Sequence, residues 1–363
     1  DPQGLEDAIF LYVMDTATDE GTVFHYTVVA PLHGLNEVFA SEPLHDREGY
    51  VVELYRDLAQ LWADHGAGAA YLAGLQDRGA ALFDELFPES MRRLLWSRRS
   101  DLGRLLLISS ESSIPWELVH LKPATGPRPK ESMFLGELGL IRWRPNGFPA
   151  TDLHARKGRV WALCPDYADP AYALSDSAAE ATFLHDTLGA EPAKGTGPAL
   201  VSLLRKGGFD LLHFSGHGMA DPSDAAAAKV LLAGKLVRGK VALDYLSSTT
   251  VEQNAKLGSP DGSGPLVVLN ACQVARGGMQ LSSIGGFATA FLKAGAAAYI
   301  STLWSVGEDP ALDFVETLYT RLLAGDTIAT AAAAARAAAR TAGEATWLAY
   351  AVYARPDARL VTT

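Results

Sequence analysis

The sequence predicts an α/β protein with a mostly parallel central sheet, preceded by an α+β N-terminal region. Three observations lead to this class. Short runs rich in Val, Leu and Ile alternate with helical patterns from about residue 157 onward. Runs that are apolar along their whole length are typical of strands that helices cover on both faces. The helical patterns end at glycines, among them Gly189, Gly295 and Gly325, which is a common way for a helix to stop.

The elements of the α/β part follow one another in a regular order. Strands are predicted at "RVWALCP", "DLLHFS", "PLVVLNA", "AAAYIST" and "TWLAYAVYA". Helices are predicted at "SDSAAEATFLHDTLG", near 197–206, at "SIGGFATAFLKAG", at 309–324 and in the segment after it. Two polar, glycine-rich segments, 218–229 and 247–264, are predicted to be loops that either become ordered on activation or frame a cleft. Because ligand sites of parallel sheets lie outside the carboxyl ends of the strands, chemistry is expected at these ends.

The N-terminal part of the chain predicts a separate α+β region. "AIFLYVM" and "TVFHYTVVA" alternate as strands do, and "RLLLISS" and "ELGLIRWR" predict two more. Apolar residues at helical spacing predict helices at about 48–65 and 68–96. The segment "GFPATDLHARKG" (147–158) is typical of a linker, so we divide the chain into 1–155 and 156–363.

Composition and charge exclude several classes of partner and site. The formal net charge of −11 argues against direct binding of nucleic acid or of an anionic membrane surface. No apolar run reaches the length of about 18 residues that a membrane span needs. The chain has 2 cysteines, Cys164 and Cys272, too few for a disulfide framework, which favours a reducing cytoplasm. Metal-ligand spacings such as CxxC and HExxH are absent from the sequence, and we expect neither a metal nor a cofactor.

Two predicted strands end in residues that can carry out chemistry. "LLHFSGHG" brings His217 to the end of one strand, and "LVVLNACQ" brings Cys272 to the end of the next. On adjacent parallel strands the two side chains would share one rim of the sheet, where an imidazole can take the proton of a thiol. Gly216 then provides a sharp turn, and Gly218 leaves room for a substrate carbonyl. The backbone N–H groups of Gly218 and Cys272 are candidates for an oxyanion hole.

Other interpretations of the same residues remain open at this point. A histidine after a glycine is often only part of a turn, and a cysteine after a strand is often a small buried hydrophobe. We assign His213, inside its strand, and Cys164, followed by a proline, to such structural roles. A hydrolase of the G-x-S/C-x-G type is disfavoured because the residues flanking Cys272 include no glycine. A ligand-binding α/β protein with an accidental His–Cys pair is the remaining alternative.

Taken together, these motifs resemble the caspase-like cysteine peptidases, and most closely the CHAT domain, a bacterial branch related to separase. "HFSGHG" and "LNACQ" carry the resemblance in the right order and spacing. "IPWELVHL", "SSIGGFATAFLKAGAAAYISTLWSV" and the closing "TWLAYAVYA" extend it over nearly the whole chain. The resemblance implies a caspase-like three-layer sandwich over 156–363. It also implies that 1–155 is a pseudo-caspase, accessory part of the same region.

The resemblance assigns catalytic roles by position. His217 matches the catalytic histidine, Cys272 the nucleophile and Gly218 the oxyanion-hole glycine, and no third acid is needed. The thiolate attacks the scissile carbonyl, the histidine protonates the leaving amine, and water then hydrolyses the thioester.

The resemblance also implies candidate substrate-binding residues for a basic P1 side chain. Asn270 stands where metacaspases carry an aspartate, and Glu180 matches an acidic position in a Leu-x-x-small-x-x-acid helix. Glu308 follows the Leu-Trp-x-Val run, with Asp309 adjacent. A desolvated carboxylate would bind an arginine strongly. The structural alternatives are a solvated helix residue for Glu180 and helix N-terminal acids for the other two.

The resemblance further implies a protein substrate and a sensor or partner that activates the enzyme. In bacteria such peptidases serve antiviral defence by cleaving another effector protein, such as a gasdermin-like pore former. The alternative is a non-proteolytic or autoinhibited caspase-like scaffold. A scaffold predicts a damaged dyad, whereas both His217 and Cys272 are present in this sequence.

Overall fold

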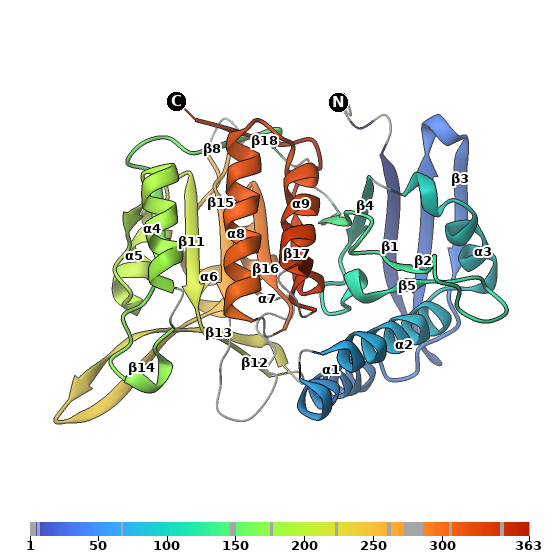
Figure 1. Ribbon diagram of the computed structural model, residues 1–363, viewed down its shortest axis with the longest axis horizontal. Coiled ribbons are helices and arrows are strands. Elements are labelled where there is room, and N and C mark those ends of the chain that lie inside the picture. The colour runs from blue at the N-terminus through green and yellow to red at the C-terminus, as the bar shows by residue number, and fades with distance from the viewer. Residues whose placement is uncertain are drawn as a thin grey trace. The chain divides into compact units, whose positions relative to one another are not determined.

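The computed structural model describes most of the chain, in two compact units, Asp1–Phe148 and Pro149–Thr363 (Figure 1). The described residues are 5, 8–66, 68–102, 104–145, 150–174, 177–221, 224–259, 263–271, 286–304, 307–341 and 345–362, without the side chains of 219–221, 224–227 and 308. Cys272 and the side chain of Glu308 therefore lie outside the described residues. The division at 155/156 stays a prediction from the sequence.

The second unit is built around a mostly parallel sheet, as the sequence predicts. Its strands lie in the order β10-β9-β11-β15-β16-β17. Their bounds are β9 (Val160–Leu163), β10 (Glu191–Pro192), β11 (Leu211–Gly216), β15 (Leu266–Ala271), β16 (Ala298–Thr302) and β17 (Tyr350–Tyr353). All neighbours pair in parallel except β17, which runs antiparallel to β16. Every residue of β11, β15, β16 and β17 is buried, which explains why these strands are apolar rather than alternating.

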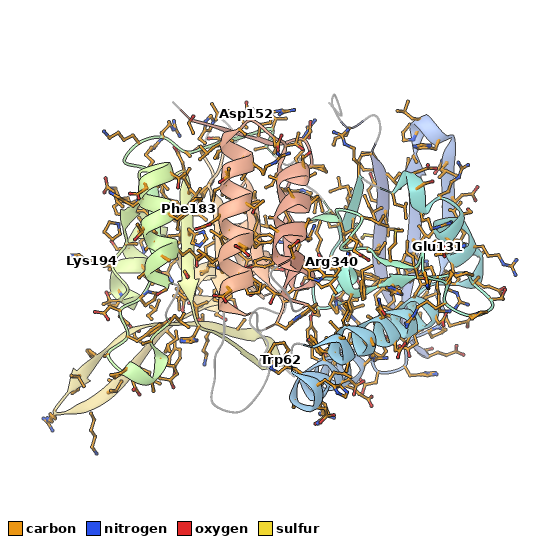
Figure 2. All side chains as sticks on the ribbon, viewed as in Figure 1. Trp62, Glu131, Asp152, Phe183, Lys194 and Arg340 are labelled. Atoms are coloured by element: carbon orange, nitrogen blue, oxygen red, sulfur yellow. The ribbon has the colours of Figure 1, made fainter. Side chains whose placement is uncertain are left out.

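Helices cover both faces of this sheet and complete three layers. One face carries α4 (Ser177–Leu188), α8 (Glu308–Leu323) and α9 (Ile328–Thr341), which lie in front of the strands in Figure 1. The other carries α5 (Gly197–Lys206), α6 (Ser248–Asn254) and α7 (Gly286–Lys293). Beside β10, the exposed Lys194 extends outward (Figure 2). A two-residue edge strand that contains a proline and is followed by a lysine is a poor template for pairing with another chain.

A three-stranded antiparallel sheet follows β11. It consists of β12 (Gly218–Asp221), β13 (Asp224–Val237) and β14 (Lys240–Ser247). The prediction of a loop over 218–229 is therefore wrong at β12 and at the start of β13. The prediction of a loop over 247–264 is wrong at α6 (Ser248–Asn254). Arg238 and Gly239 form the two-residue turn between β13 and β14, both with positive φ, as a tight hairpin requires. A short parallel pair joins β8 (Asp152–His154) to β18 (Arg359–Val361).

The first unit is an α+β body with its own sheet, in the order β7-β4-β1-β2-β3. The strands are β1 (Ile9–Thr18), β2 (Gly21–Ala30), β3 (Leu35–Ala40), β4 (Leu105–Ser109) and β7 (Ile141–Trp143), with a separate pair β5 (His120–Leu121) and β6 (Met133–Phe134). The helices are α1 (Arg47–His65), α2 (Ala69–Leu86) and α3 (Glu89–Ser97). The single helix predicted over 68–96 is two helices, because Pro88 starts a new one after extended backbone at Phe87.

A buried ion pair ties the "IPWELVHL" segment to the sheet of the first unit. The Nε of Arg142, on β7, donates to Glu117 Oε1 at 2.8 Å, and its Nη2 donates to the carbonyl of Ile114 at 3.2 Å. The Arg142 and Glu117 side chains are 1% and 0% exposed. Two N–H donors of Arg142, Nε and Nη2, meet the two oxygens of the Glu117 carboxylate, so the two buried charges satisfy each other.

We expect Arg142→Ala to lower the free energy of unfolding by about 3 kcal/mol, because it leaves the Glu117 carboxylate buried and unpaired. Urea denaturation measures this loss. The double variant Glu117→Leu/Arg142→Leu removes both charges and is expected to recover most of it. Equal losses in the single and double variants would show that lost packing, not the stranded charge, causes the effect.

Candidate functional site

The two strands that end at the predicted catalytic residues are parallel neighbours. In the register of β11 and β15, Ser215 pairs with Asn270 and Gly216 with Ala271. The next residue along each chain is His217 after β11 and Cys272 after β15. The adjacency on which the predicted dyad depends is therefore confirmed, whereas the position of the Cys272 thiol is outside the described residues.

His217 is held from several sides and is 3% exposed. Its Nε2 lies 2.8 Å from the carbonyl oxygen of Tyr172, and its backbone N–H donates to Tyr167 Oη at 3.0 Å. The rings of Tyr167 and Tyr172 lie 5.2 and 5.7 Å from the imidazole, measured between centroids. A carbonyl only accepts, so Nε2 carries a proton and Nδ1 is the basic nitrogen of the neutral ring. This is the tautomer that a general base at Nδ1 requires.

Gly216 is a glycine because the chain passes close to Tyr167, not because it turns sharply. A Cβ at this position would lie 2.5 Å from Tyr167 Oη and 2.6 Å from Phe214 Cζ. The strand β11 runs through Gly216 as its last residue. Gly218 begins β12 and pairs with Val230, and the carbonyl of His217 accepts from the N–H of Leu231 at 2.9 Å. The oxyanion role of Gly218 stays a prediction.

Glu180, from the first turn of α4, forms the centre of a buried polar cluster on the face of β11 and β15. Its carboxylate is within hydrogen-bond distance of His213 Nε2 at 2.5 Å and of Ser215 Oγ at 2.6 Å. The Asn270 amide donates to Oε1 at 2.9 Å and to Oε2 at 3.2 Å. Glu180 is 3% exposed and Asn270 is 0% exposed. The structure thus brings together two of the predicted substrate-binding residues, and excludes the solvated alternative for Glu180.

Two tyrosines complete the cluster and set the direction of its hydrogen bonds. Tyr350 Oη donates to Asn270 Oδ1 at 2.8 Å, and Tyr319 Oη lies 2.9 Å from His213 Nδ1. Burial, with Glu180 nearby, raises the pKa of Tyr319 well above its usual value, so its hydroxyl keeps the proton and donates to His213 Nδ1. His213 Nε2–H then donates to Glu180. We name Glu180, His213, Ser215, Asn270, Tyr319 and Tyr350 the Glu180 cluster.

The two acids at the start of α8 differ in what the structure describes. Asp309 is exposed in the first turn of α8, where the helix dipole favours a negative charge. Of Glu308 only the backbone is described, as the first residue of this helix. The position of Asp309 is therefore consistent with an acid that stabilises the N-terminus of a helix. The substrate-binding role of Glu308 and Asp309 stays a prediction.

Cys164, the residue after β9, has the properties of a structural cysteine. Burial, followed by the nearby Glu180 charge, raises the pKa of its thiol to about 12. At pH 8 only about 10⁻⁴ of such a thiol is ionised, which makes it a poor nucleophile. The assignment of Cys164 to a structural role from the sequence is consistent with this environment.

Sequence reasoning did not identify Ser215, Tyr319, Tyr350, Tyr167 or Tyr172 as parts of this site. Ser215 carried a signal, since residues 213 and 215 alternate along one strand and share a face. The four tyrosines come from distant segments, and nothing local in the sequence marks them. Among the described residues, no group of three or more His, Cys, Asp or Glu side chains is arranged to hold a metal ion. No helix in the described ranges has the length and apolar character to cross a membrane.

Comparison with known proteins gives a family and a fold. The family model of the CHAT domain matches residues 76–353. The separase chain of the Saccharomyces cerevisiae separase–securin complex is similar at 12% identity and a TM-score of 0.52, over 98% of this chain and 30% of that chain. A structure called "Structure of Protease" is 13% identical with a TM-score of 0.44, over 82% of this chain and 81% of that one. This chain thus spans less than a third of the separase chain. No curated protein sequence matches it. The likeness to separase shows the fold, a caspase-like α/β sandwich.

Proposed function

The chain belongs to the CHAT-domain family, and from this premise we propose that it is a cysteine endopeptidase with His217 and Cys272 as its catalytic dyad. The observation that carries the proposal is the register of β11 and β15, which end one residue before His217 and Cys272 respectively. The bond from His217 Nε2 to the Tyr172 carbonyl supports it, because it leaves Nδ1 as the base.

In the proposed reaction, His217 Nδ1 takes the proton of the Cys272 thiol, and the thiolate attacks the scissile carbonyl carbon. The carbonyl π bond opens to an oxyanion, which the N–H groups of Gly218 and Cys272 are proposed to stabilise. The C–N bond breaks, the amine leaves with the proton from His217, and a thioester remains. Water, deprotonated by the same ring, then releases the carboxylic acid and the thiol.

We propose that the substrate-binding pocket prefers a basic P1 residue. Glu180 is a buried carboxylate, and among the described residues no Lys or Arg pairs with it. Its oxygens accept from His213, Ser215 and Asn270, so its charge acts on a substrate cation through space and through the polarised Asn270 amide rather than by a direct contact. Glu308 and Asp309 are the further proposed carboxylates.

A fluorogenic peptide library that varies only P1 tests this preference. We expect Arg or Lys at P1 to give the highest kcat/KM, and Glu180→Gln to reduce kcat/KM for the Arg substrate by about tenfold, since it removes the charge and keeps the shape. Asp186→Asn, at an exposed position of the same helix, is the matched control and should change kcat/KM little. A best P1 residue that is acidic or apolar would overturn the preference.

The substrate is proposed to be a protein, with activation by a sensor or partner protein and a role in bacterial defence against phage, including cleavage of a gasdermin-like effector. The support is the family membership, together with the deep burial of His217. Cleavage of candidate proteins by the wild type, with and without each candidate activator, tests this proposal. Binding without cleavage in every combination would favour the scaffold alternative.

A further inference from the structure

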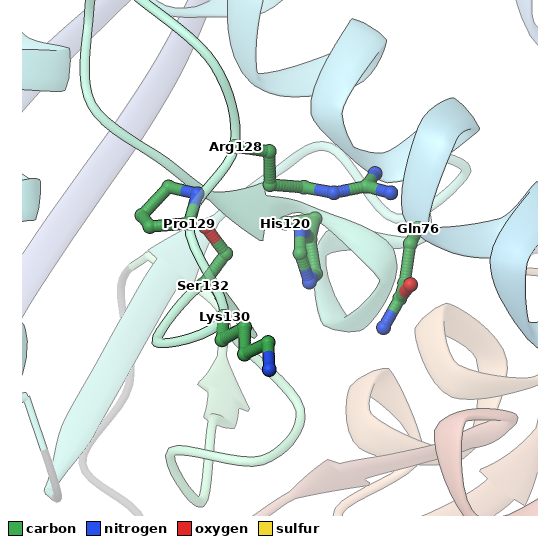
Figure 3. A pocket seen from close by; sticks show the side chains of 6 residues that line it. All are labelled: Gln76, His120, Arg128, Pro129, Lys130 and Ser132. Carbon is green, nitrogen blue, oxygen red and sulfur yellow. The ribbon is translucent and has the colours of Figure 1, made fainter.

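A pocket that is separate from the proposed catalytic site lies entirely within the first unit. It has a volume of about 320 Å³ (Figure 3). Its lining residues come from α2, β5 and the segment between β5 and β6: Gln76, His120, Arg128, Pro129, Lys130 and Ser132. We call it the cationic pocket. Its volume is at the lower end of the range of about 300–1,000 Å³ typical of small-molecule sites.

His120 is a buried polar group that lines this pocket, and among the described residues it has no hydrogen-bond partner. It is 1% exposed, and neither Nδ1 nor Nε2 is bonded to any described residue. Burial, then the charge of Arg128, lowers the pKa of His120 to about 4, so the ring is neutral and presents one donor and one acceptor. Buried polar groups are nearly always paired, and an unpaired one costs about 1–3 kcal/mol. This exception suggests that a ligand supplies the missing partner.

The position of His120 is fixed by close packing. Its ring meets Phe134 edge-on with centroids 4.5 Å apart. On the other side, Gly79 of α2 brings the helix against this segment: a Cβ there would lie 2.1 Å from the Leu118 carbonyl oxygen and 3.0 Å from His120 Cβ. The backbone at His120 thus lies close against α2, one side of its ring packs on Phe134, and the imidazole lines the pocket (Figure 3).

The other groups around the pocket are mostly donors and cations. Arg128 and Lys130 bring two positive charges, in a chain whose net charge is −11. The Oδ1 of the exposed Asp77 lies 2.8 Å from Arg128 Nη1. The other N–H groups of the Arg128 guanidinium are available for a ligand. The buried Ser132 Oγ has no partner among the described residues. With the Gln76 amide, these groups surround the space from several directions (Figure 3).

We propose that the cationic pocket binds the phosphate group of a small molecule. Two cations, a hydroxyl, an amide and an imidazole N–H match an anion that has several oxygens in a tetrahedral arrangement. A carboxylate, with two oxygens in one plane, would leave donors on other sides of the pocket unpaired. The proposal does not depend on the peptidase activity, because none of these residues belongs to the proposed catalytic site.

Histidine side-chain NMR of the full chain, labelled with ¹⁵N-histidine, tests the proposal. The probes are inorganic phosphate, adenosine monophosphate and adenosine, and His120→Gln identifies the His120 signals. We expect phosphate and adenosine monophosphate to shift these signals saturably, and adenosine not to do so. Tighter binding of the monophosphate would identify a phosphate ester as the ligand class, and equal binding would identify free phosphate.

Charge variants make the test specific. Arg128→Gln and Lys130→Gln change partly or fully exposed side chains and are expected to weaken phosphate binding by about tenfold or more. Arg93→Gln, an equal loss of charge on α3 whose side chain is 68% exposed, is the matched control and should change the affinity less than about twofold. The proposal is overturned if neither phosphate compound shifts the His120 signals, or if Arg93→Gln weakens binding as much as Arg128→Gln.

Discussion

Cys272→Ala is expected to reduce kcat/KM for peptide cleavage by at least about 10³-fold, because no other group in the proposed site can form the thioester. The matched control is Cys164→Ala. Its thiol, with a pKa of about 12, contributes no nucleophile, so we expect this variant to cleave at a rate close to wild type. Steady-state assays on the best substrate of the P1 library measure kcat/KM for both variants.

His217→Ala is expected to cause a loss of similar size, and the double variant with Cys272→Ala should be no worse than either single one. Residues that act as one unit are not additive, since removing either one already disables the step. Additive losses, or strong cleavage by the Cys272→Ala protein, would contradict the proposed dyad.

The second large effect concerns stability. Glu180→Ala is expected to lower the free energy of unfolding by about 5 kcal/mol, because it leaves the buried donors of His213, Ser215 and Asn270 without their acceptor at about 1–3 kcal/mol each. Loss of the Glu180 side chain also leaves a cavity under α4. Chemical denaturation monitored by circular dichroism measures the change.

Glu180→Gln keeps the volume and one oxygen acceptor, so we expect it to lose about half as much. Asp186→Ala, at an exposed position on the same helix, should change stability by less than about 0.5 kcal/mol. If Glu180→Ala unfolded at the wild-type denaturant concentration, the cluster would not contribute to the stability of the second unit.

The sheet of the second unit could be predicted from the sequence because its signal is local. Runs such as 211–216 and 266–271 are apolar throughout, and burial on both faces is the physical cause. The same pattern predicted that His217 and Cys272 each follow a buried strand, and that they share a rim of the sheet if the two strands are parallel neighbours. The structure shows that β11 and β15 are parallel neighbours.

The antiparallel sheet after β11 could not be predicted in the same way. Its hairpin turn is Arg238–Gly239, which lacks the Asn-Gly or Asp-Gly pair that usually marks such a turn. Residues 224–228, "DAAAA", carry little strand propensity, and they extend a strand that pairs with β12 from Asp224 and with β14 from Lys229. Tertiary pairing here outweighs local preference.

The Glu180 cluster shows the limit of reasoning from motifs about the candidate site. The resemblance identified Glu180 and Asn270 as candidate site residues. It did not predict that Glu180 contacts both Asn270 and His213. The hydroxyls of Tyr319 and Tyr350 enter from α8 and β17, far along the chain. The packing of α8 on the sheet brings in Tyr319, and the pairing of β17 with β16 brings in Tyr350. A polar cluster assembled from five elements, α4, β11, β15, α8 and β17, has no local sequence pattern.

The measurement that tests the central claim most directly is covalent labelling by a peptidyl acyloxymethyl ketone with arginine at P1, located by peptide mass spectrometry. In this reaction a thiolate displaces the carboxylate leaving group and forms a thioether. We predict stoichiometric labelling of Cys272, its loss in His217→Ala, and no label on Cys164, whose thiol stays protonated near neutral pH. Labelling of Cys164 instead, or labelling of Cys272 that is unchanged without His217, would contradict the account of this site.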